Sequence, residues 1–188
     1  MSKLILASAS PRRQQLLAQI DVMPDAISPA GIDETPHRGE VPRVYAIRMG
    51  LEKAEAVHAS GQFTLAGDTV VSVGRRILPK AETDQDVIDC LTLISGRAHH
   101  VMTSVCVIAP DGQLAQRLSD TRVIVKRLSA AEIESYVETK DGIGKAGGYA
   151  IQGPFGAHIK QISGSYTGVM GLPVHETAQL LGGLGYRL

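Results

Sequence analysis

Residues 99–108 (HHVMTSVCVI) and 117–128 (RLSDTRVIVKRL) form two long runs rich in β-branched side chains, and the sequence APDGQ lies between them at 109–113. β-Branched residues favour strands, and Pro, Asp and Gly are the residues that tight turns use. The stretch therefore predicts a long β-hairpin, which means that at least two strands of the sheet are antiparallel.

On both sides of this hairpin, strand-like apolar runs alternate with helical patterns. The expected strands include 4–7 and 63–78, the latter with a turn at Gly74, and the expected helices begin near residues 11, 42, 83, 129 and 173. Such alternation combined with a hairpin predicts an α/β fold with a mixed sheet flanked by helices. The sequence has no internal repeat and no clear linker, so we expect residues 1–188 to form a single domain.

Glycine is concentrated near the end of the chain. Residues 142–171 contain nine of the 20 glycines, too many for a helix, and the hydrophobic residues among them argue against a disordered linker. We expect this backbone to be held close to another part of the molecule. Within it, Lys145 supplies a charge, and the amide of Gln152 can read the edge of a base.

The composition excludes several classes of function. The chain has 19 Lys and Arg against 19 Asp and Glu, no Trp and only two Phe, which argues against nucleic-acid binding. No apolar run approaches the roughly 20 residues that span a bilayer, and no secretion signal is recognisable. We therefore expect a cytoplasmic protein that binds neither nucleic acid nor membrane. Cys90 and Cys106 lack the spacing of a metal or disulfide motif and are expected to be buried thiols.

The stretch 5–17 (ILASASPRRQQLL) places Arg12 and Arg13 where a short strand turns into a helix that starts at Pro11, with Ser10 as the expected N-cap. Each arginine is unfavourable there by about 0.3–1 kcal/mol, because a helix N-terminus is itself positive. The two side chains could extend into solvent or pair with distant carboxylates. Alternatively, they could bind a phosphate together with the small residues that precede the helix.

Further charged residues are candidates for such a site. Asp68 lies in an apolar strand-like run, so it either accepts bonds from backbone N–H groups or acts as a metal ligand or general base. Asp33 and Glu34 are adjacent in a loop, where solvated acids are the usual case. Lys53 lies among glutamates in a helical pattern and is by default solvated, whereas Lys80 follows a strand end, from which it can reach a phosphate.

Other motif matches lack the required context. GIGKAG at 142–147 fits G-x-G-x-x-G, but it follows an expected helix, the reverse of a dinucleotide-binding turn. His99 and His100 are adjacent on an expected strand, so they point to opposite faces and cannot act as a helical metal pair. The sequence contains neither a Walker A motif nor a nucleophile elbow.

Eight blocks occur in order along the chain: SASPRR at 8–13, DE at 33–34, EKA at 52–54, AGDTVV at 66–71, a lysine at 80, SGRAHHVMT at 95–103, KAGGYAIQG at 145–153 and SGSYTGVMGLP at 163–173. Together they closely resemble the Maf family of nucleoside triphosphate pyrophosphatases, and the last two resemble its dTTP- and UTP-hydrolysing branch rather than the 7-methyl-GTP branch. The resemblance implies an elongated twisted sheet with two lobes around a cleft, as in the inosine triphosphate pyrophosphatases. It also implies a homodimer, since family members are often dimers.

The resemblance further implies cleavage between the α and β phosphates of a nucleoside triphosphate, with Asp68 as the catalytic acid or base. Asp68 and Glu34 would form the catalytic pair and hold Mg²⁺ or Mn²⁺ through oxygen ligands, and which acid is the base stays open. The resemblance also implies that Arg12, Thr69 and Gln152 help to select the nucleobase of the substrate. The other residues implied to bind substrate are Ser8, Arg13, Lys53, Lys80 and Lys145.

Two points stay open at the level of sequence. In the family a proline follows the lysine at position 80, whereas here Pro79 precedes it, so the course of this loop is not fixed by the pattern. The alternative to an enzyme is a protein that senses nucleotides and regulates septum formation and cell division without essential catalysis. Retention of Asp68 and Glu34 favours the enzyme, and modified pyrimidine triphosphates are further candidate substrates. Every version requires Arg12, Asp68 and Lys80 to face one pocket.

Overall fold

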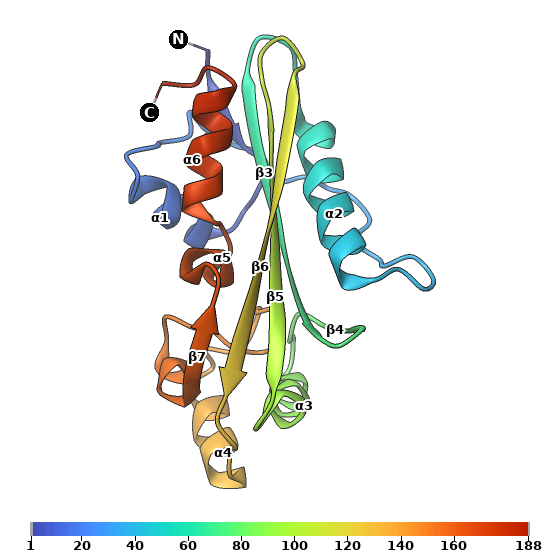
Figure 1. The fold of residues 1–188 in the computed structure, drawn as a ribbon, viewed down its shortest axis with the longest axis vertical. Coiled ribbons are helices and arrows are strands. Elements are labelled where there is room, and N and C mark those ends of the chain that lie inside the picture. Colours follow the sequence, from blue (N-terminus) through green and yellow to red (C-terminus); the bar gives the residue numbers. More distant parts are fainter. Residues whose placement is uncertain (1, 188) are drawn as a thin grey trace.

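The computed structural model describes residues 2–187 and contains a seven-stranded mixed sheet with helices on both faces (Figure 1). The strands are β1 (Leu4–Leu6), β2 (Ala26–Ile27), β3 (Phe63–Val73), β4 (Arg76–Leu78), β5 (Ala98–Ile108), β6 (Leu114–Val125) and β7 (Ile159–Ser163). The α-helices are α1 (Pro11–Ala18), α2 (Pro42–Val57), α3 (Asp84–Ile94), α4 (Ala130–Glu138), α5 (Tyr166–Met170) and α6 (Val174–Gly183), and η1 (Pro154–His158) is a 3₁₀ helix.

The strand order is β2-β1-β3-β5-β6-β7, with β4 paired to β3. β1 is parallel to β2 and β3, and every other pairing is antiparallel. The predicted hairpin is confirmed: β5 pairs with β6 from Ala98 opposite Ile124 to Ile108 opposite Leu114. The expected mixed sheet flanked by helices is therefore confirmed, and its long, twisted strands give the molecule the elongated shape seen in Figure 1.

One edge of β3 is left open in its middle. β1 pairs with Phe63–Leu65 at one end, and β4 pairs with Val71–Val73 at the other. The chain after β1 makes one more bond, from the Ala7 N–H to the Leu65 carbonyl, and then turns away into α1. The five residues of AGDTV at 66–70 therefore lie between two points where neighbouring strands end, and the cleft described below forms there.

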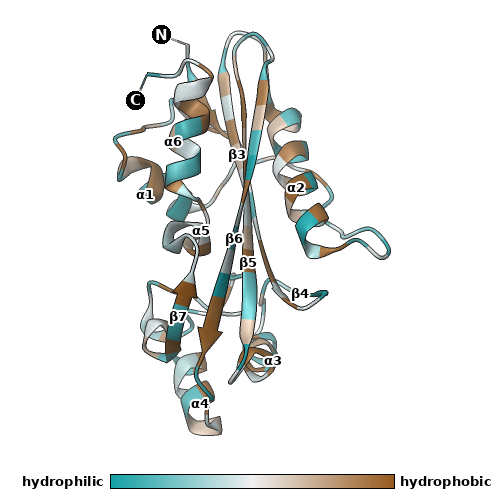
Figure 2. Ribbon diagram, in the orientation of Figure 1, coloured by the Kyte–Doolittle hydropathy of each residue, from teal (hydrophilic) through white to brown (hydrophobic). Residues whose placement is uncertain are grey.

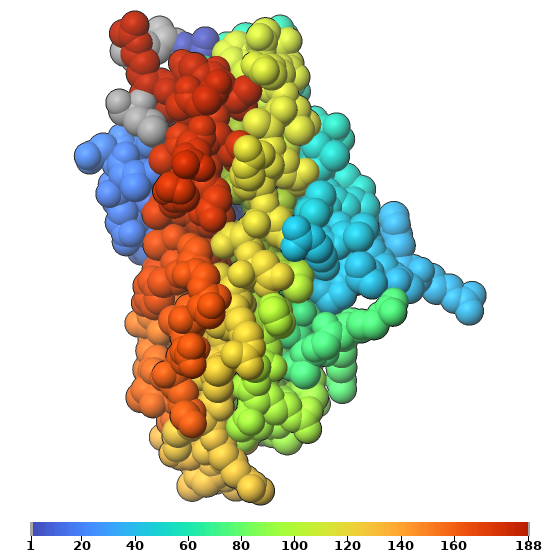
Figure 3. Space-filling model, in the orientation of Figure 1, coloured from blue at the N-terminus to red at the C-terminus, as the bar shows by residue number. Residues whose placement is uncertain are grey.

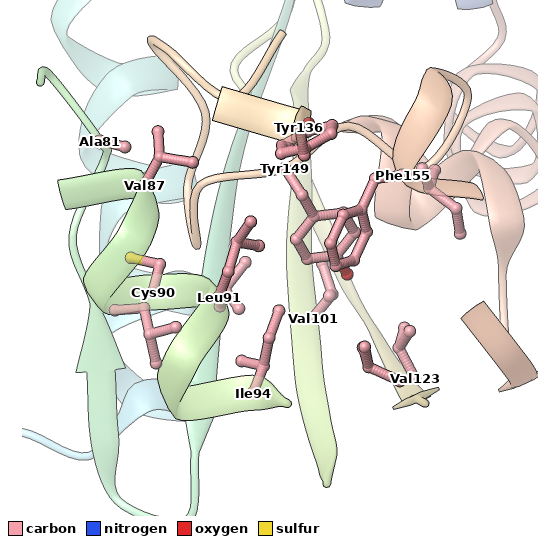
Figure 4. Close-up of a cluster of buried hydrophobic side chains, with 14 residues drawn as sticks. Ala81, Val87, Cys90, Leu91, Ile94, Val101, Val123, Tyr136, Tyr149 and Phe155 are labelled. Carbon is pink, nitrogen blue, oxygen red and sulfur yellow. The ribbon is translucent and has the colours of Figure 1, made fainter. Parts of the chain in front are cut away.

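Two large buried apolar clusters lie on either side of this opening. One joins α1, α6 and β1 and includes Leu4, Leu17 and Leu181, while the other joins α3, α4 and β7 and includes Leu91 and Phe155. Figure 4 shows part of the second cluster, where Tyr136, Tyr149 and Phe155 lie beside side chains of α3. α2 alternates hydrophilic and hydrophobic residues along its length (Figure 2), as expected for a helix with one buried side. Each lobe therefore has its own core.

Local sequence signals account for several helix ends. The predicted capping box at Ser129 and Glu132 is confirmed at the start of α4, and Thr83 forms a second one with Asp86 at the start of α3. Cys90 and Cys106 are buried free thiols, as expected. None of the helices within residues 2–187 is both long and apolar enough to cross a bilayer.

The glycine-rich segment was only partly predicted. It contains β7 and the short helix α5, so the expectation that it holds no helix was wrong. Gly168 lies inside α5. A Cβ at this position would come within 3.0 Å of the Ser119 Oγ of β6, so glycine lets the helix pack closely against the strand. The expected close approach is present at Gly147, whose φ is +71° and whose Cβ would lie 2.7 Å from Cγ1 of Val71.

Candidate active site

A cleft of about 980 Å³ opens beside the middle of β3, between the two lobes. Its walls come from the loop after β1, the loop before α2, β3, the chain after β4 and the glycine-rich segment. Figure 3 shows the loop before α2 and the turn between β3 and β4 projecting from the same flank of the molecule. The lining includes all ten residues singled out from the sequence: Ser8, Arg12, Arg13, Glu34, Lys53, Asp68, Thr69, Lys80, Lys145 and Gln152.

One side of the cleft, here termed the acidic wall, consists of Glu34, Lys53 and Asp68. Lys53 Nζ donates to Asp68 Oδ1 at 2.7 Å and lies 2.9 Å from Glu34 Oε2, so one ammonium bridges both acids. Lys53 and Asp68 are 8% and 7% exposed. The default expectation of a solvated Lys53 was therefore wrong. Small residues favour its burial, because Ala54 of α2 and Ala66 of β3 belong to one buried cluster and leave room for the helix to lie close to the strand.

Glu34 belongs to an irregular loop, yet α2 holds its backbone. The Tyr45 hydroxyl donates to the Glu34 carbonyl at 2.6 Å, and burial, with the nearby charges of Asp68 and Glu34, raises the pKa of Tyr45 to about 12. Asp33, its neighbour, is exposed and only accepts a local bond from the Thr35 N–H. The two adjacent acids therefore differ: Glu34 turns into the cleft, and Asp33 shapes the loop.

Arg13 ties three parts of the chain together beneath the cleft. Its guanidinium donates from Nε to the Gly171 carbonyl at 2.9 Å, from Nη1 to Ser8 Oγ at 2.8 Å and from Nη2 to Thr69 Oγ1 at 3.4 Å. Burial is the main cause that lowers the pKa of Arg13, and the charge of Asp68 opposes that shift. Ser10 holds the N-cap position of α1 as expected, but its side chain makes no capping bond.

The opposite side of the cleft, here termed the basic wall, consists of Arg12, Lys80 and Lys145. Lys80 pairs with Ala146 in an isolated antiparallel bridge, and the Ala81 N–H donates to the Lys145 carbonyl at 3.0 Å. This bridge answers the question left by the displaced proline, because it places Lys80 against the glycine-rich segment. The two lysines thus belong to adjacent extended chains.

The basic wall makes no close ion pair within the described residues, although the charge of Asp141 acts on both Arg12 and Lys145. Among residues 2–187, no carboxylate oxygen lies within 4.0 Å of a side-chain nitrogen of Arg12, Lys80 or Lys145. Burial lowers the pKa of Arg12. Burial and the positive charge of Arg12 lower the pKa of Lys145, the charge of Asp141 opposes this shift, and Lys80 adds a smaller lowering effect. Three neighbouring cations in a partly desolvated cleft are an arrangement that suits an anion.

Sequence reasoning missed other residues of the lining. Asp141 follows α4 and accepts a bond from the Tyr136 hydroxyl at 3.1 Å, and it is the acid whose charge raises the pKa of Arg12. Tyr149 lines the cleft with its ring, while its hydroxyl bonds to Nε2 of the buried His99 at 2.8 Å. The bond from the Tyr45 hydroxyl to the Glu34 carbonyl was not predictable from the helical pattern of α2, because this bond depends on how the preceding loop folds back.

The acidic wall also fits a divalent cation. Residues 2–187 contain no group of three or more His, Cys, Asp or Glu side chains that could hold a metal by themselves. Mg²⁺, however, is usually held by one or two carboxylates together with water and substrate phosphates. Glu34 and Asp68 supply two hard oxygen donors that already converge on one cation, the Lys53 ammonium. The donor set therefore suits a cation that arrives with a polyphosphate.

Comparison with known proteins places this architecture. A family model described as Maf-like protein matches residues 3–184, nearly the whole chain. The chain belongs to the Maf family. It is 59% identical over 186 residues to the dTTP/UTP pyrophosphatase of Caulobacter vibrioides, covering 98% of this chain and 96% of that protein. It is 53% identical to the dTTP/UTP pyrophosphatase of Mesorhizobium japonicum, covering 100% of this chain and 94% of that one.

Among solved structures, this Maf chain resembles a HAM1 protein from Coxiella burnetii, with a TM-score of 0.52 over 97% of this chain and 100% of that one. The two sequences are only 14% identical, so the likeness concerns the fold. The fold expected from the family resemblance is thus found in an independent structure.

Proposed function

We propose that this protein is a nucleoside triphosphate pyrophosphatase that hydrolyses dTTP and UTP to the monophosphate and pyrophosphate. The relatives reported above carry that activity in their names and match nearly the whole chain. The observation that carries the proposal is that one cleft is lined both by three cations without a close ion pair and by two acids that share one lysine. Binding of a triphosphate needs the cations, and its hydrolysis needs the acids.

The basic wall would bind the phosphates. Phosphoryl transfer depends mainly on positioning and on stabilising negative charge, and Arg12, Lys80 and Lys145 would supply three positive charges for it. Arg13 is fixed by its bonds to Gly171 and other partners, so it would hold the Ser8 loop in place beside the phosphates. The triphosphate would thereby provide the missing counter-charge for arginines at a helix N-terminus.

The acidic wall would activate water. Asp68 is proposed to orient a water molecule and accept its proton as the water oxygen attacks phosphorus and the bond to the bridging oxygen between the α and β phosphates breaks. Lys53 donates to the Asp68 carboxylate at 2.7 Å and so fixes its orientation. Carboxylate and ammonium come from β3 and α2, two rigid elements, which fixes their geometry.

Glu34 and Asp68 are proposed to hold a divalent cation, Mg²⁺ or Mn²⁺. When bound, such an ion neutralises phosphate charge and orients the substrate. Selection of the base is proposed for Arg12, Thr69 and Gln152, which line different parts of the cleft. Thr69 is already oriented by its bonds with Arg13 and Thr103, whereas Gln152 is exposed and can move toward a base.

A panel of nucleoside triphosphates tests the proposal. The purified chain is incubated with dTTP, UTP, modified pyrimidine triphosphates and purine triphosphates, each with Mg²⁺ or Mn²⁺, and pyrophosphate and orthophosphate are measured separately. The proposal expects pyrophosphate and the nucleoside monophosphate from dTTP and UTP. Release of orthophosphate alone, or binding of nucleotide without any turnover, would contradict it.

Three broader features are proposed on the basis of the family resemblance. They are a single domain spanning residues 1–188, a homodimer, and action in the cytoplasm. A single cooperative unfolding transition and the mass of the particle in solution, measured by light scattering, test the first two. The location is tested by fractionation of cells that express the protein at its natural level.

A further inference from the structure

Glu34 lies in a part of the chain that has no regular structure. Residues 28–41 form neither helix nor strand, and most of them are exposed. The Glu34 side chain itself is 54% exposed. A carboxylate on such a loop would be expected to sample many positions, because the loop has no ladder of backbone bonds to hold it. Its closeness to Lys53 therefore needs a cause outside the loop.

Arg48 of α2 provides that cause. Its guanidinium donates from Nε to Glu40 Oε1 at 2.8 Å and from Nη2 to Glu40 Oε2 at 2.7 Å, a forked ion pair. Nη2 also donates to the Thr35 carbonyl at 3.2 Å. The Arg48 and Glu40 side chains are only 17% and 5% exposed, so the pair is shielded from water. Arg48 thus binds the loop on the C-terminal side of Glu34 at two separate residues.

Tyr45, one turn earlier on α2, completes the attachment. Its hydroxyl donates to the Glu34 carbonyl, and the Arg48 guanidinium lies over its ring, 5.5 Å from the centroid. Glu52, one turn later, bonds to Nη1 of Arg48 at 3.1 Å and keeps that side chain extended along the helix. The carbonyls of Glu34 and Thr35 and the carboxylate of Glu40 are therefore all bound by one surface of α2.

We propose that Arg48 is a positioning residue that, together with Tyr45, fixes Glu34 in the active site before substrate and metal bind. The proposal rests on the function proposed above for its kinetic consequence, but the attachment itself can be tested without activity. A preordered Glu34 spares the enzyme the entropy of ordering the loop at each turnover. Arg48 touches none of the residues of the basic wall, so its effect should be confined to metal binding and turnover.

The test compares Arg48→Ala with Arg43→Ala. Both residues lie on α2, but Arg43 makes only a 4.0 Å ion pair with Asp120 and its side chain is 62% exposed. The first readout is the rate at which trypsin cuts the nucleotide-free protein after Arg38, an exposed residue of the loop. We expect about tenfold faster cutting in Arg48→Ala and no change in Arg43→Ala, since only the former releases the loop.

The second readout is Mn²⁺ affinity, followed by electron paramagnetic resonance with a non-hydrolysable dTTP analogue present. We expect about a tenfold weaker Kd for Mn²⁺ in Arg48→Ala, with the Mn²⁺ needed for half-maximal turnover raised to a similar extent. Arg48→Lys keeps the charge but loses the forked geometry, so it should recover only part of both effects. Tyr45→Phe should weaken Mn²⁺ binding by a smaller factor, and circular dichroism establishes that α2 is intact.

Equal cutting after Arg38 in the two arginine variants would overturn the attachment. Faster cutting with unchanged Mn²⁺ affinity would overturn the positioning role. If the wild-type chain released no pyrophosphate from any nucleotide, the proposed function would fail, yet a weaker Mn²⁺ Kd in Arg48→Ala would still support the role of Arg48 in placing Glu34. The two failures are therefore distinguishable.

Discussion

The two walls of the cleft carry opposite charges and differ in how far that charge is satisfied within the protein. In the acidic wall, Lys53 pairs with Glu34 and Asp68 at 2.9 and 2.7 Å, although a single ammonium balances only one of the two carboxylates. In the basic wall, no such partner is present for Arg12, Lys80 or Lys145 among residues 2–187. The acids are thus held by an ion pair within the free protein, whereas the cations of the basic wall are proposed to gain close partners only when a ligand binds.

This difference assigns different tasks to the walls. Paired, buried groups keep a fixed geometry, which suits the residues that act on a proton or a water molecule. Unpaired cations remain free to move and gain most when a polyanion enters, which suits substrate capture and release of pyrophosphate. Substitutions in the acidic wall should therefore lower kcat, whereas substitutions in the basic wall should mainly weaken substrate binding.

The largest effect is expected for Asp68→Asn. It removes the proposed proton acceptor while keeping nearly the same shape, and kcat for pyrophosphate release from dTTP should fall about 10²–10⁴-fold. Steady-state kinetics measure the change, and Asp120→Asn, at an exposed aspartate of β6, is the matched control. Near-normal turnover in Asp68→Asn would end its assigned role.

Acid should lower the stability of the fold around His99, which bonds to Tyr149 in the lining of the cleft. Burial depresses the pKa of His99 from its usual 6.5 to about 4, so His99 stays neutral while bonded to Tyr149. Because the unfolded chain takes up the proton first, the free energy of unfolding should fall by up to roughly 3 kcal/mol as pH drops from 6.5 to 4, at about 1.4 kcal/mol per pKa unit.

Urea titrations across this pH range measure that loss. His99→Gln has no titrating ring at this position, so its unfolding free energy should depend less steeply on pH than that of the wild type. Identical pH slopes for the two proteins would show that His99 does not contribute in this window.

The basic wall is probed by Arg12→Ala and Lys80→Ala. Each should weaken binding of a non-hydrolysable dTTP analogue about 10- to 100-fold, because each removes a charge-assisted bond to phosphate. Calorimetry measures the affinity, with Arg117→Ala, at an exposed arginine of β6, as control. If Arg12→Ala changed neither affinity nor base preference, the phosphate-binding role of the first loop would be wrong.

The smallest effect is expected for Gln152→Ala. Gln152 is exposed, and its loss should remove one hydrogen bond to the base, worth about a two- to tenfold change in the preference for dTTP over a purine triphosphate. Ratios of kcat/KM for the two substrates measure it. An equal loss with both substrates would mean that Gln152 does not contact the base.

The sequence predicted those features that depend on local chemistry. The hairpin followed from β-branched runs around APDGQ, and the Ser129 box followed from spacing. Asp68 drew attention because a carboxylate in an apolar strand requires a partner. That partner, Lys53, was not predictable from its helical pattern, since its burial depends on how α2 packs on β3, where Ala54 and Ala66 share one buried cluster.

What the sequence missed depends on contacts between distant segments. The course of the chain at Lys80 is set by its bridge to Ala146, which no local pattern encodes. The shielded ion pair between Arg48 and Glu40 was likewise not predicted, because both residues look like ordinary surface charges in the sequence. The residues that the family resemblance named line one cleft, and the fold shows which of them are already paired.

The most direct test is a crystal structure with a dTTP analogue in which nitrogen bridges the α and β phosphates. The account predicts phosphate oxygens within roughly 3.2 Å of side-chain nitrogens of Arg12, Lys80 and Lys145, with Asp68 facing the α phosphate across the cleft. An analogue bound with its phosphates in solvent, or outside the cleft, and with the three cations unchanged would contradict it.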